Sequence, residues 1–288
     1  MLKLGFIGAG TVGTALAIRL SSKGYQVLAV SSQSRTSAEN LGRSISNCRV
    51  FDNAQDVVDM AEVVFVTTPD DAINRVVSKL KWHAGQSVVH CSGADSTEIL
   101  QPARKLGAQV GVFHPLQTFA STKQAVANIP GSTFAIEAEK PLLDVLQDMA
   151  NALDGHWIEL KANDKVLYHA AAVIACNYLV TLVKLATDMW QTFSIPPQQA
   201  TQALLPLLRG TLNNIETIGI PKCLTGPIAR GDSGTVKKHL AALQKTAPNL
   251  LSTYQELGLQ TIPIALAKGR INEQQAAELK TILEKAEI

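Results

Sequence analysis

The chain has 288 residues, of which 46% are hydrophobic and 17% are charged, and its formal net charge is +2. This composition indicates a globular protein with a large core and excludes a disordered chain. The small net charge, without any basic cluster, also argues against a nucleic-acid-binding protein. The length is sufficient for two domains.

Four cysteines are scattered along the chain, at positions 48, 91, 176 and 223, without a Cys-x-x-Cys spacing. Neither a zinc site nor a disulfide framework is therefore predicted, which is typical of a reducing compartment. The first apolar run begins at once and leaves no room for a signal peptide. We expect a cytoplasmic protein without a metal site.

A glycine-rich turn joins the first predicted strand, residues 4–7, to the first predicted helix, residues 14–20. Gly8, Gly10 and Gly13 form the pattern Gly-x-Gly-x-x-Gly. The first glycine permits a tight turn, the second lets the backbone approach a pyrophosphate, and the third lets the helix pack on the strand. This context predicts a dinucleotide site. Its expected cofactor contacts are Gly8, Ala9, Gly10, Thr11, Val12 and Gly13.

The end of the second predicted strand indicates which dinucleotide binds. An NAD-preferring fold places an acid there, where it binds the ribose 2′-hydroxyl. Residues 25–30 instead run into a serine-rich segment, residues 31–37, that contains no acid. Ser32 and Ser34 can donate hydrogen bonds to a 2′-phosphate, and the guanidinium of Arg35 matches its charge. The pattern favours NADP over NAD, the alternative interpretation being a solvated turn.

Strands and helices alternate up to residue 160. Further strands are predicted at residues 49–51, 62–67, 87–91, 109–113, 133–137 and 156–160, and helices at 37–43, 54–60, from 68 onward, and at 141–153. This alternation predicts an α/β fold with a parallel, doubly wound Rossmann sheet. Ligands of such sheets bind at the carboxyl ends of the strands. We expect cofactor contacts there from Thr67, Thr68, Pro69 and Ser92.

From residue 163 onward the spacing is helical only. Helices are predicted at residues 165–191, 197–217, 235–244, 247–257, 261–268 and 273–287. We therefore expect an NADP-binding Rossmann-like domain at residues 1–160 and an all-α substrate and dimerisation domain at residues 161–288. Residues 166–185 are apolar enough to resemble a membrane span, but they include His169, Asn177 and Lys184. We predict a buried central helix and no membrane contact.

Three polar residues on the long predicted helix are candidates for catalysis. Lys165 and His169 are four residues apart and share a helical face, with Asn177 further along. Reduction of a ketone by hydride transfer needs a proton donor and a group that polarises the carbonyl oxygen. Lys165 or His169 could donate the proton, and Asn177 could orient the substrate. The alternative is that each is a structural residue with its hydrogen bonds satisfied.

Two further segments could carry chemistry. His114 follows a predicted strand and precedes a proline, which favours an extended backbone. It is a second candidate acid, or a histidine that braces the domain junction, whereas His90 is expected to pack internally. Arg230 lies on a loop and could hold a substrate carboxylate in bidentate fashion. Asp232 in the same loop could equally be the N-cap of a helix.

These motifs resemble known families. The glycine-rich turn, Ser34-Arg35, Thr68-Pro69-Asp70 and the helical second half resemble the 6-phosphogluconate dehydrogenase-like superfamily, which includes ketopantoate reductases, pyrroline-5-carboxylate reductases and prephenate dehydrogenases. More narrowly, the chain resembles a family that joins a Rossmann-like domain to a helical domain of formerly unknown function. That resemblance spans nearly the whole chain and is carried by residues 90–93, 114–119, 168–172, 177–178 and 225–232.

The resemblance implies a Rossmann fold and a nicotinamide site. Some members resemble an alternative ketopantoate reductase lineage, which implies NADPH-dependent reduction of 2-dehydropantoate to pantoate. Lys165 and His169 resemble the Lys-x-x-His-Asn helix of 6-phosphogluconate dehydrogenases, with a spacing one residue longer and Ala170 in place of the asparagine. His114-Pro115 resembles the His-Pro of prephenate dehydrogenases.

Our leading hypothesis is an NADPH-dependent reductase of a small 2-oxo acid, with ketopantoate as the best single substrate. One alternative is a dehydrogenase of a prephenate-like or hydroxy acid, and another is a non-catalytic NADP-binding regulatory or scaffolding protein. Because the helical half is rich in apolar residues, as at 204–208, we also expect a homodimer. The expected partners are a small-molecule carboxylate and a second copy of the chain.

Overall fold

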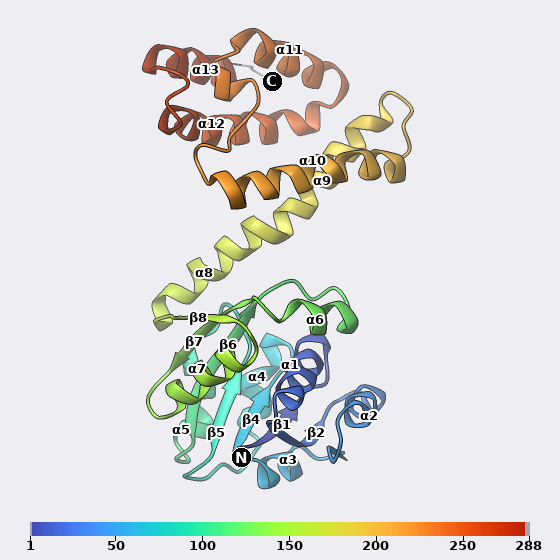
Figure 1. Cartoon of the computed structure of the whole chain (residues 1–288), viewed down its shortest axis with the longest axis vertical. Helices are drawn as coiled ribbons and strands as arrows, with labels where there is room; N and C mark the ends of the chain where they lie inside the picture. The colour runs from blue at the N-terminus through green and yellow to red at the C-terminus, as the bar shows by residue number, and fades with distance from the viewer. Residues whose placement is uncertain (1, 286–288) are drawn as a thin grey trace. The chain divides into compact units, whose positions relative to one another are not determined.

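The computed structural model describes residues 2–285 and divides into two compact units, Met1–Cys176 and Asn177–Ile288 (Figure 1). The first unit contains the whole sheet, whose last strand ends at Glu159, and continues into the first part of the long helix. The predicted boundary near residue 160 therefore coincides with the end of the sheet, while the compact units divide later, within that helix.

An eight-stranded sheet forms the centre of the first unit. Its strands are β1 Lys3–Ile7, β2 Gln26–Ser31, β3 Arg49–Phe51, β4 Val63–Val66, β5 Ser87–His90, β6 Gln109–Leu116, β7 Thr133–Ala138 and β8 His156–Glu159. Their order, β3-β2-β1-β4-β5-β6-β7-β8, extends the Rossmann order and confirms the predicted fold class.

The prediction that all strands are parallel is wrong at one place, because β6 and β7 are antiparallel. The chain leaves β6 at its carboxyl end, forms α6 (Thr122–Asn128) beside α1, and enters β7 without crossing to the opposite edge of the sheet. A crossover connection is what makes neighbouring strands parallel, and here it is missing. The strand β6 is also longer than predicted, since it includes His114 and Pro115.

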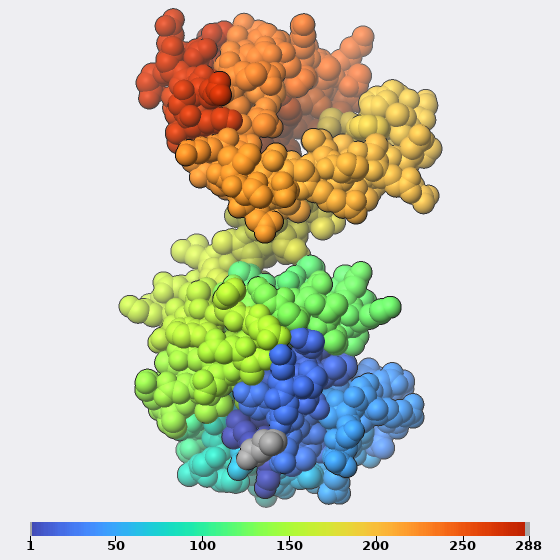
Figure 2. All heavy atoms as spheres, in the orientation of Figure 1, coloured from blue at the N-terminus to red at the C-terminus, as the bar shows by residue number. Residues whose placement is uncertain are grey.

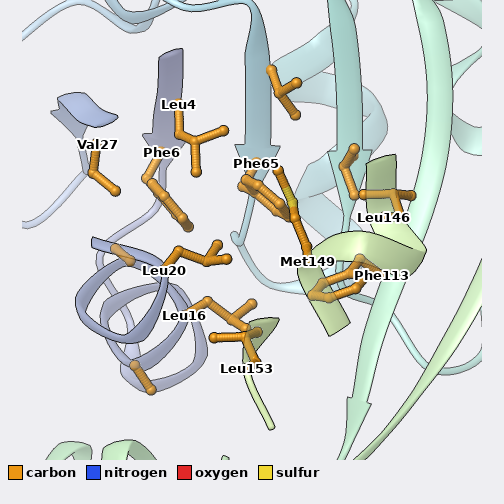
Figure 3. Packing of buried hydrophobic residues seen from close by; sticks show 14 of the residues in the cluster. Leu4, Phe6, Leu16, Leu20, Val27, Phe65, Phe113, Leu146, Met149 and Leu153 are labelled. Atoms are coloured by element: carbon orange, nitrogen blue, oxygen red, sulfur yellow. The ribbon is translucent and has the colours of Figure 1, made fainter. Parts of the chain in front are cut away.

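Helices cover both faces of the sheet. They are α1 Thr11–Ser22, α2 Arg35–Ser44, α3 Ala54–Met60, α4 Asp70–Val77, α5 Gln101–Arg104, α6 and α7 Leu142–Ala152, with short 3₁₀ segments η1 Thr97–Leu100 and η2 Ala162–Asp164. Alternate residues of the strands enter two apolar clusters. Phe6 packs on the side of α1 and α7 (Figure 3), and Ile7 packs on the other side, with residues of α3 and α4. This double burial explains why the strands read as continuous apolar runs.

The second half is helical, as predicted. Its elements are α8 Lys165–Ala172, the π-helical segment η3 Val173–Asn177, α9 Tyr178–Gln191, α10 Pro197–Ile218, η4 Ile228–Arg230, α11 Ser233–Thr246, η5 Pro248–Leu250, α12 Leu251–Ala267 and α13 Glu273–Lys285. The last predicted helix extended to residue 287, and residues 286 and 287 lie outside the described residues.

A predicted helix break at Gly258 is wrong, because α12 continues through it. A Cβ at Gly258 would lie 2.8 Å from a methyl carbon of Leu283 on α13. The glycine therefore permits close packing of two helices and does not end one.

The prediction of a buried central helix is also wrong for the single chain. Leu167 and Val180 are 76% and 70% exposed, and the yellow-green side chains of α8 are visible at the surface in Figure 2. By length and hydropathy alone, the helix spanning Ala162–Gln191 is one that could cross a membrane. The expectation of burial assumes that the chain covers its own apolar helix, whereas the described part of the chain leaves many of the apolar side chains of that helix exposed.

Candidate active site

The glycine-rich turn has the geometry that its pattern predicted. Gly8 has a φ of +108°, and a Cβ there would lie 2.7 Å from the backbone of Thr67. Gly13 is equally crowded by Thr67, whose hydroxyl donates a 2.8 Å hydrogen bond to the carbonyl of Gly8. A Cβ at Gly10 would meet nothing within 4 Å. Two glycines thus serve the packing of the turn, and Gly10 leaves its backbone open to a ligand.

A cavity of about 740 Å³ opens beside this turn, within the size range of ligand sites. It is lined by Ile7, Gly8, Ala9, Gly10, Ser31, Ser32, Gln33, Ser34, Ser37, Asp52, Ala54, Thr67, Thr68, Pro69, Ala72, Arg75, Val76 and Lys79. Eight predicted cofactor residues are among them. Thr11, Val12 and Gly13 belong to α1, whose N-terminus has no side-chain cap and no acid in its first turn.

Two features of the cavity fit an anionic dinucleotide. The free N–H groups at the start of α1 are suited to hold a pyrophosphate. The hydroxyl of Thr68 is buried and has no hydrogen-bond partner in the described part of the chain, although Thr68 lines the cavity. Buried polar atoms in folded proteins almost always have a partner, so the hydroxyl points to a ligand.

Arg35 does not line the cavity. Its guanidinium pairs with Glu39 at 3.0 Å and with Asp52, and these hydrogen bonds raise the pKa of Arg35. Two other cations, Arg75 and Lys79, line the cavity and have no ion-pair partner among the described residues. Sequence reasoning missed them because they lie on and just after α4, far along the chain from the serine-rich turn.

A second group of side chains surrounds Gly93, just beyond β5. The rings of His114 and His169 meet edge to face with centroids 6.0 Å apart, and the Tyr168 hydroxyl lies 2.8 Å from Nδ1 of His114. A Cβ at Gly93 would lie 2.9 Å from Nε2 of His114 and closer still to Nδ1 of His169. The register explains this position: His90, the last residue of β5, pairs with Val112, so His114 extends two residues past that strand.

Lys165 supplies a buried cation to this group. It is 1% exposed, and its Nζ donates a 3.2 Å hydrogen bond to the carbonyl of Ser92. Burial lowers the pKa of Lys165, while nearby carboxylates, with Glu137 first, act in the opposite direction. The hydroxyl of Ser92, a predicted cofactor contact, lies 2.8 Å from a carboxylate oxygen of Asp70. Ser92 thus belongs to this polar group and does not line the cavity.

Burial also sets the protonation of the aromatic groups. It lowers the pKa of His114 to about 3, assisted by the charge of Lys165, and raises the pKa of Tyr168 to about 12. His90 is fully buried, as predicted, with its pKa lowered to about 4. At neutral pH His114 is therefore a neutral imidazole and Tyr168 a neutral phenol. Nδ1 of His169 is buried and has no hydrogen-bond partner among the described residues, and so it too is available to a ligand.

The two remaining predicted residues belong to the second unit. Asn177 ends the π-helical segment η3 and is exposed. Arg230 ends η4, and its guanidinium lies 3.7 Å from a carboxylate oxygen of Asp232. The carboxylate of Asp232 accepts hydrogen bonds from the backbone and side chain of Thr235, which confirms it as the N-cap of α11.

Comparison with protein families agrees with this division of the chain. Residues 1–115 match the family model of a Rossmann-like domain, and residues 132–261 match that of a domain of unknown function, DUF2520. The chain joins a Rossmann-like domain to a DUF2520 domain. This is the combination that the sequence resemblance implied, and it is consistent with a 6-phosphogluconate dehydrogenase-like fold. The cavity belongs to the Rossmann-like domain, while Lys165 and His169 lie in the DUF2520 segment.

Solved structures share this two-domain fold. A Thermotoga maritima protein is 26% identical, with 93% of this chain and 100% of that one covered and a TM-score of 0.75. A Bacteroides fragilis protein described as an NADP oxidoreductase is 24% identical over 91% of this chain and 98% of that one, with a TM-score of 0.73. Plasmodium falciparum pyrroline carboxylate reductase, with NADP bound, is 14% identical over 98% of each chain, with a TM-score of 0.57. The last two show likeness of fold alone.

One curated relative matches part of this chain. Glycerol-3-phosphate dehydrogenase [NAD(P)+] of Clostridium botulinum is 29% identical over 109 residues, which are 34% of this chain and 33% of the relative. The match thus spans about a third of that enzyme's length.

Proposed function

We propose that this chain is an NADP(H)-dependent oxidoreductase that reduces the carbonyl group of a small 2-oxo acid. The observation that carries the proposal is the pair of sites in the first unit: a dinucleotide-sized cavity at the glycine-rich turn, and two histidines directed at Gly93. The similar proteins named as an NADP oxidoreductase and an NADP-bound reductase support the same class.

Different residues of the cavity would bind different parts of the cofactor. The backbone at Gly8–Gly10 and the N-terminus of α1 hold the pyrophosphate, and the Thr68 hydroxyl gains a partner. Ser32 and Ser34 at the end of β2, together with the cations Arg75 and Lys79, would hold the 2′-phosphate. When bound, the nicotinamide supplies hydride to the carbonyl carbon.

The side chains around Gly93 polarise and protonate the carbonyl oxygen of the substrate. If the Tyr168 hydroxyl donates to Nδ1 of His114, the single proton of the neutral ring is on Nε2, the atom that faces Gly93. His114 then polarises the oxygen as a hydrogen-bond donor. His169 or Lys165 delivers the proton, with His169 preferred because its Nδ1 is unpartnered at the same place. Asn177 and Arg230 stay predicted contacts of the substrate and its carboxylate.

Ketopantoate is the substrate we propose first. The test is NADPH oxidation by the purified protein with a panel of 2-oxo acids, with a pyrroline carboxylate included as a comparison. Turnover with ketopantoate supports the proposal. Reduction of NADP+ by hydroxy acids, measured in a second assay, without NADPH oxidation by any 2-oxo acid identifies a dehydrogenase. NADPH binding without turnover of any compound would identify a regulatory or scaffolding protein.

We further propose that the chain forms a homodimer in which the exposed apolar side chains of α8 and α9 are covered by a second copy. Val166, Leu167, Ile174 and Val180 are each at least 64% exposed, which is unusual for apolar residues grouped on one helix. Sedimentation at micromolar concentration without detergent should give twice the mass of the chain. A monomer, or a protein that stays in solution only with detergent, would contradict this proposal.

A further inference from the structure

The helical unit contains a cavity of its own, of about 380 Å³, that is separate from the dinucleotide cavity. It lies between the segment that precedes α11 and the residues that follow α12. Its lining residues are Leu224, Thr225, Gly226, Ala229, Arg230, Lys268 and Arg270. Three of these seven carry positive charges and none carries a negative charge, which is the charge pattern of an anion site.

The three cations are held near one another although like charges repel. Nζ of Lys268 donates a 2.6 Å hydrogen bond to the carbonyl of Leu224, which fixes the ammonium group on the cavity wall. An ammonium group has three N–H donors, so two remain after this bond. Arg270 has no ion pair or hydrogen bond from its side chain among residues 2–285. Nothing in the described structure therefore neutralises this part of the cavity.

The acid that pairs with Arg230 is already engaged. Both carboxylate oxygens of Asp232 accept hydrogen bonds from Thr235, at 3.0 and 2.8 Å, and this capping lowers the pKa of Asp232. Its contact with Arg230 is an exposed pair at 3.7 Å, and such pairs stabilise little. The guanidinium of Arg230 is therefore available to a better acceptor.

The backbone leaves room for such an acceptor. Gly226 has a φ of +99°, and a Cβ at that position would meet nothing within 4 Å. Thr225 beside it is exposed, and its hydroxyl makes no hydrogen bond within residues 2–285. The segment before α11 thus offers a hydroxyl, an uncrowded backbone and the guanidinium group of Arg230, and the residues after α12 offer one guanidinium and one ammonium group.

We propose that this cavity binds a compact oxyanion, a carboxylate or a phosphate group, through Arg230, Lys268 and Arg270. Guanidinium groups bind both kinds of oxyanion in bidentate geometry, so the shared chemistry is that of planar or tetrahedral oxygens with negative charge. The inference extends the predicted role of Arg230 to a three-cation cavity. The inference rests on the proposed function in one respect: the carboxylate of a 2-oxo acid substrate is one of the oxyanions that the cavity could bind.

The test is a calorimetric titration of the full-length protein, at low ionic strength and without NADPH, with inorganic phosphate and separately with acetate. We expect saturable binding of at least one anion, which identifies the preferred oxyanion and weakens as salt is added. Arg230→Ala and Arg270→Ala should each weaken binding about tenfold, and Arg270→Glu should abolish it. Lys222→Ala, which removes an exposed charge of the same segment outside the cavity, is the matched control.

The proposal is overturned if the protein binds neither phosphate nor acetate. It is also overturned if the arginine variants bind the anion as tightly as Lys222→Ala does. Thermal unfolding distinguishes anion binding from a purely structural role, in which Arg270 would only stabilise the C-terminal end of α12 by its interaction with the helix dipole. In that case Arg270→Ala would lower the melting temperature and leave anion binding unchanged, which also overturns the proposal. Because NADPH is absent from the titration, a failure of the proposed oxidoreductase activity does not affect this result.

Discussion

The dinucleotide cavity and the group around Gly93 are both in the first unit, but they are constructed differently. The cavity is formed largely by backbone and small side chains at the ends of β1, β2 and β4, and many of its lining residues lie in short runs directly after these strands. The second group brings together side chains from β6, α8 and the segment after β5, and it buries a cation among imidazoles. The first site is thus a shape that accepts a cofactor, and the second is a set of tuned titratable groups.

This difference predicts that the second site is the more sensitive to single changes in chemistry. His169→Ala or Lys165→Ala should lower kcat by about 10² to 10⁴, the usual contribution of general acid catalysis, and leave NADPH affinity within a few-fold. Steady-state kinetics and a fluorescence titration of NADPH measure the two effects. Near-normal turnover in both variants would make α8 structural and His114 the leading acid.

A steric change at Gly93 should separate the two sites without removing any titratable group. Gly93→Ala places a methyl group against both imidazoles and should lower kcat about 10²-fold through their displacement. NADPH affinity should change little, because Gly93 does not line the cavity. Gly234→Ala, where a Cβ has ample space, is the control. Unchanged kcat in Gly93→Ala would show that no reacting group occupies this place.

Which cations bind the 2′-phosphate, Arg35 outside the cavity or Arg75 and Lys79 on its wall, can be tested by comparing the affinities for NADPH and NADH. Removing one charge-assisted phosphate contact should weaken NADPH binding about tenfold and leave NADH binding nearly unchanged. We expect this result for Arg75→Ala and Lys79→Ala, and a smaller effect for Arg35→Ala because Glu39 and Asp52 already pair with its guanidinium. Equal weakening of both cofactors by each variant would exclude any of the three from the 2′-phosphate site.

The buried histidine should also leave a signature in the pH dependence of stability. Because the folded-state pKa of His114 lies near 3, below the ordinary 6.5, only the unfolded chain binds a proton between those values. The contribution of His114 is fully present above pH 6.5 and decreases by about 1.4 kcal/mol per pH unit as the pH falls toward 3. His114→Gln should flatten the dependence of the unfolding free energy on pH over that window, measured by urea denaturation. An unchanged slope would show that His114 is solvated.

The correct and incorrect expectations divide along the same line. Three features were predictable from the sequence because each depends on a few consecutive residues and on backbone conformation. They are the glycine-rich turn, the end of the strand before Thr67 and the N-cap at Asp232. The antiparallel β7 and the continuous α12 were not, because they depend on which segments pack together. The exposure of α8 and α9 was missed for the same reason.

The sequence by itself determined the Rossmann-like fold, the dinucleotide turn and the helical second half, because local spacing and glycine geometry specify them. Only the tertiary structure decided which polar side chains act together. It placed His114 against Tyr168 and His169, paired Arg35 with two carboxylates, and turned Arg75 and Lys79 toward the cavity. Charges and hydrogen bonds act through space over a few ångströms. Residues that are distant in sequence come that close only after the sheet and its helices have packed.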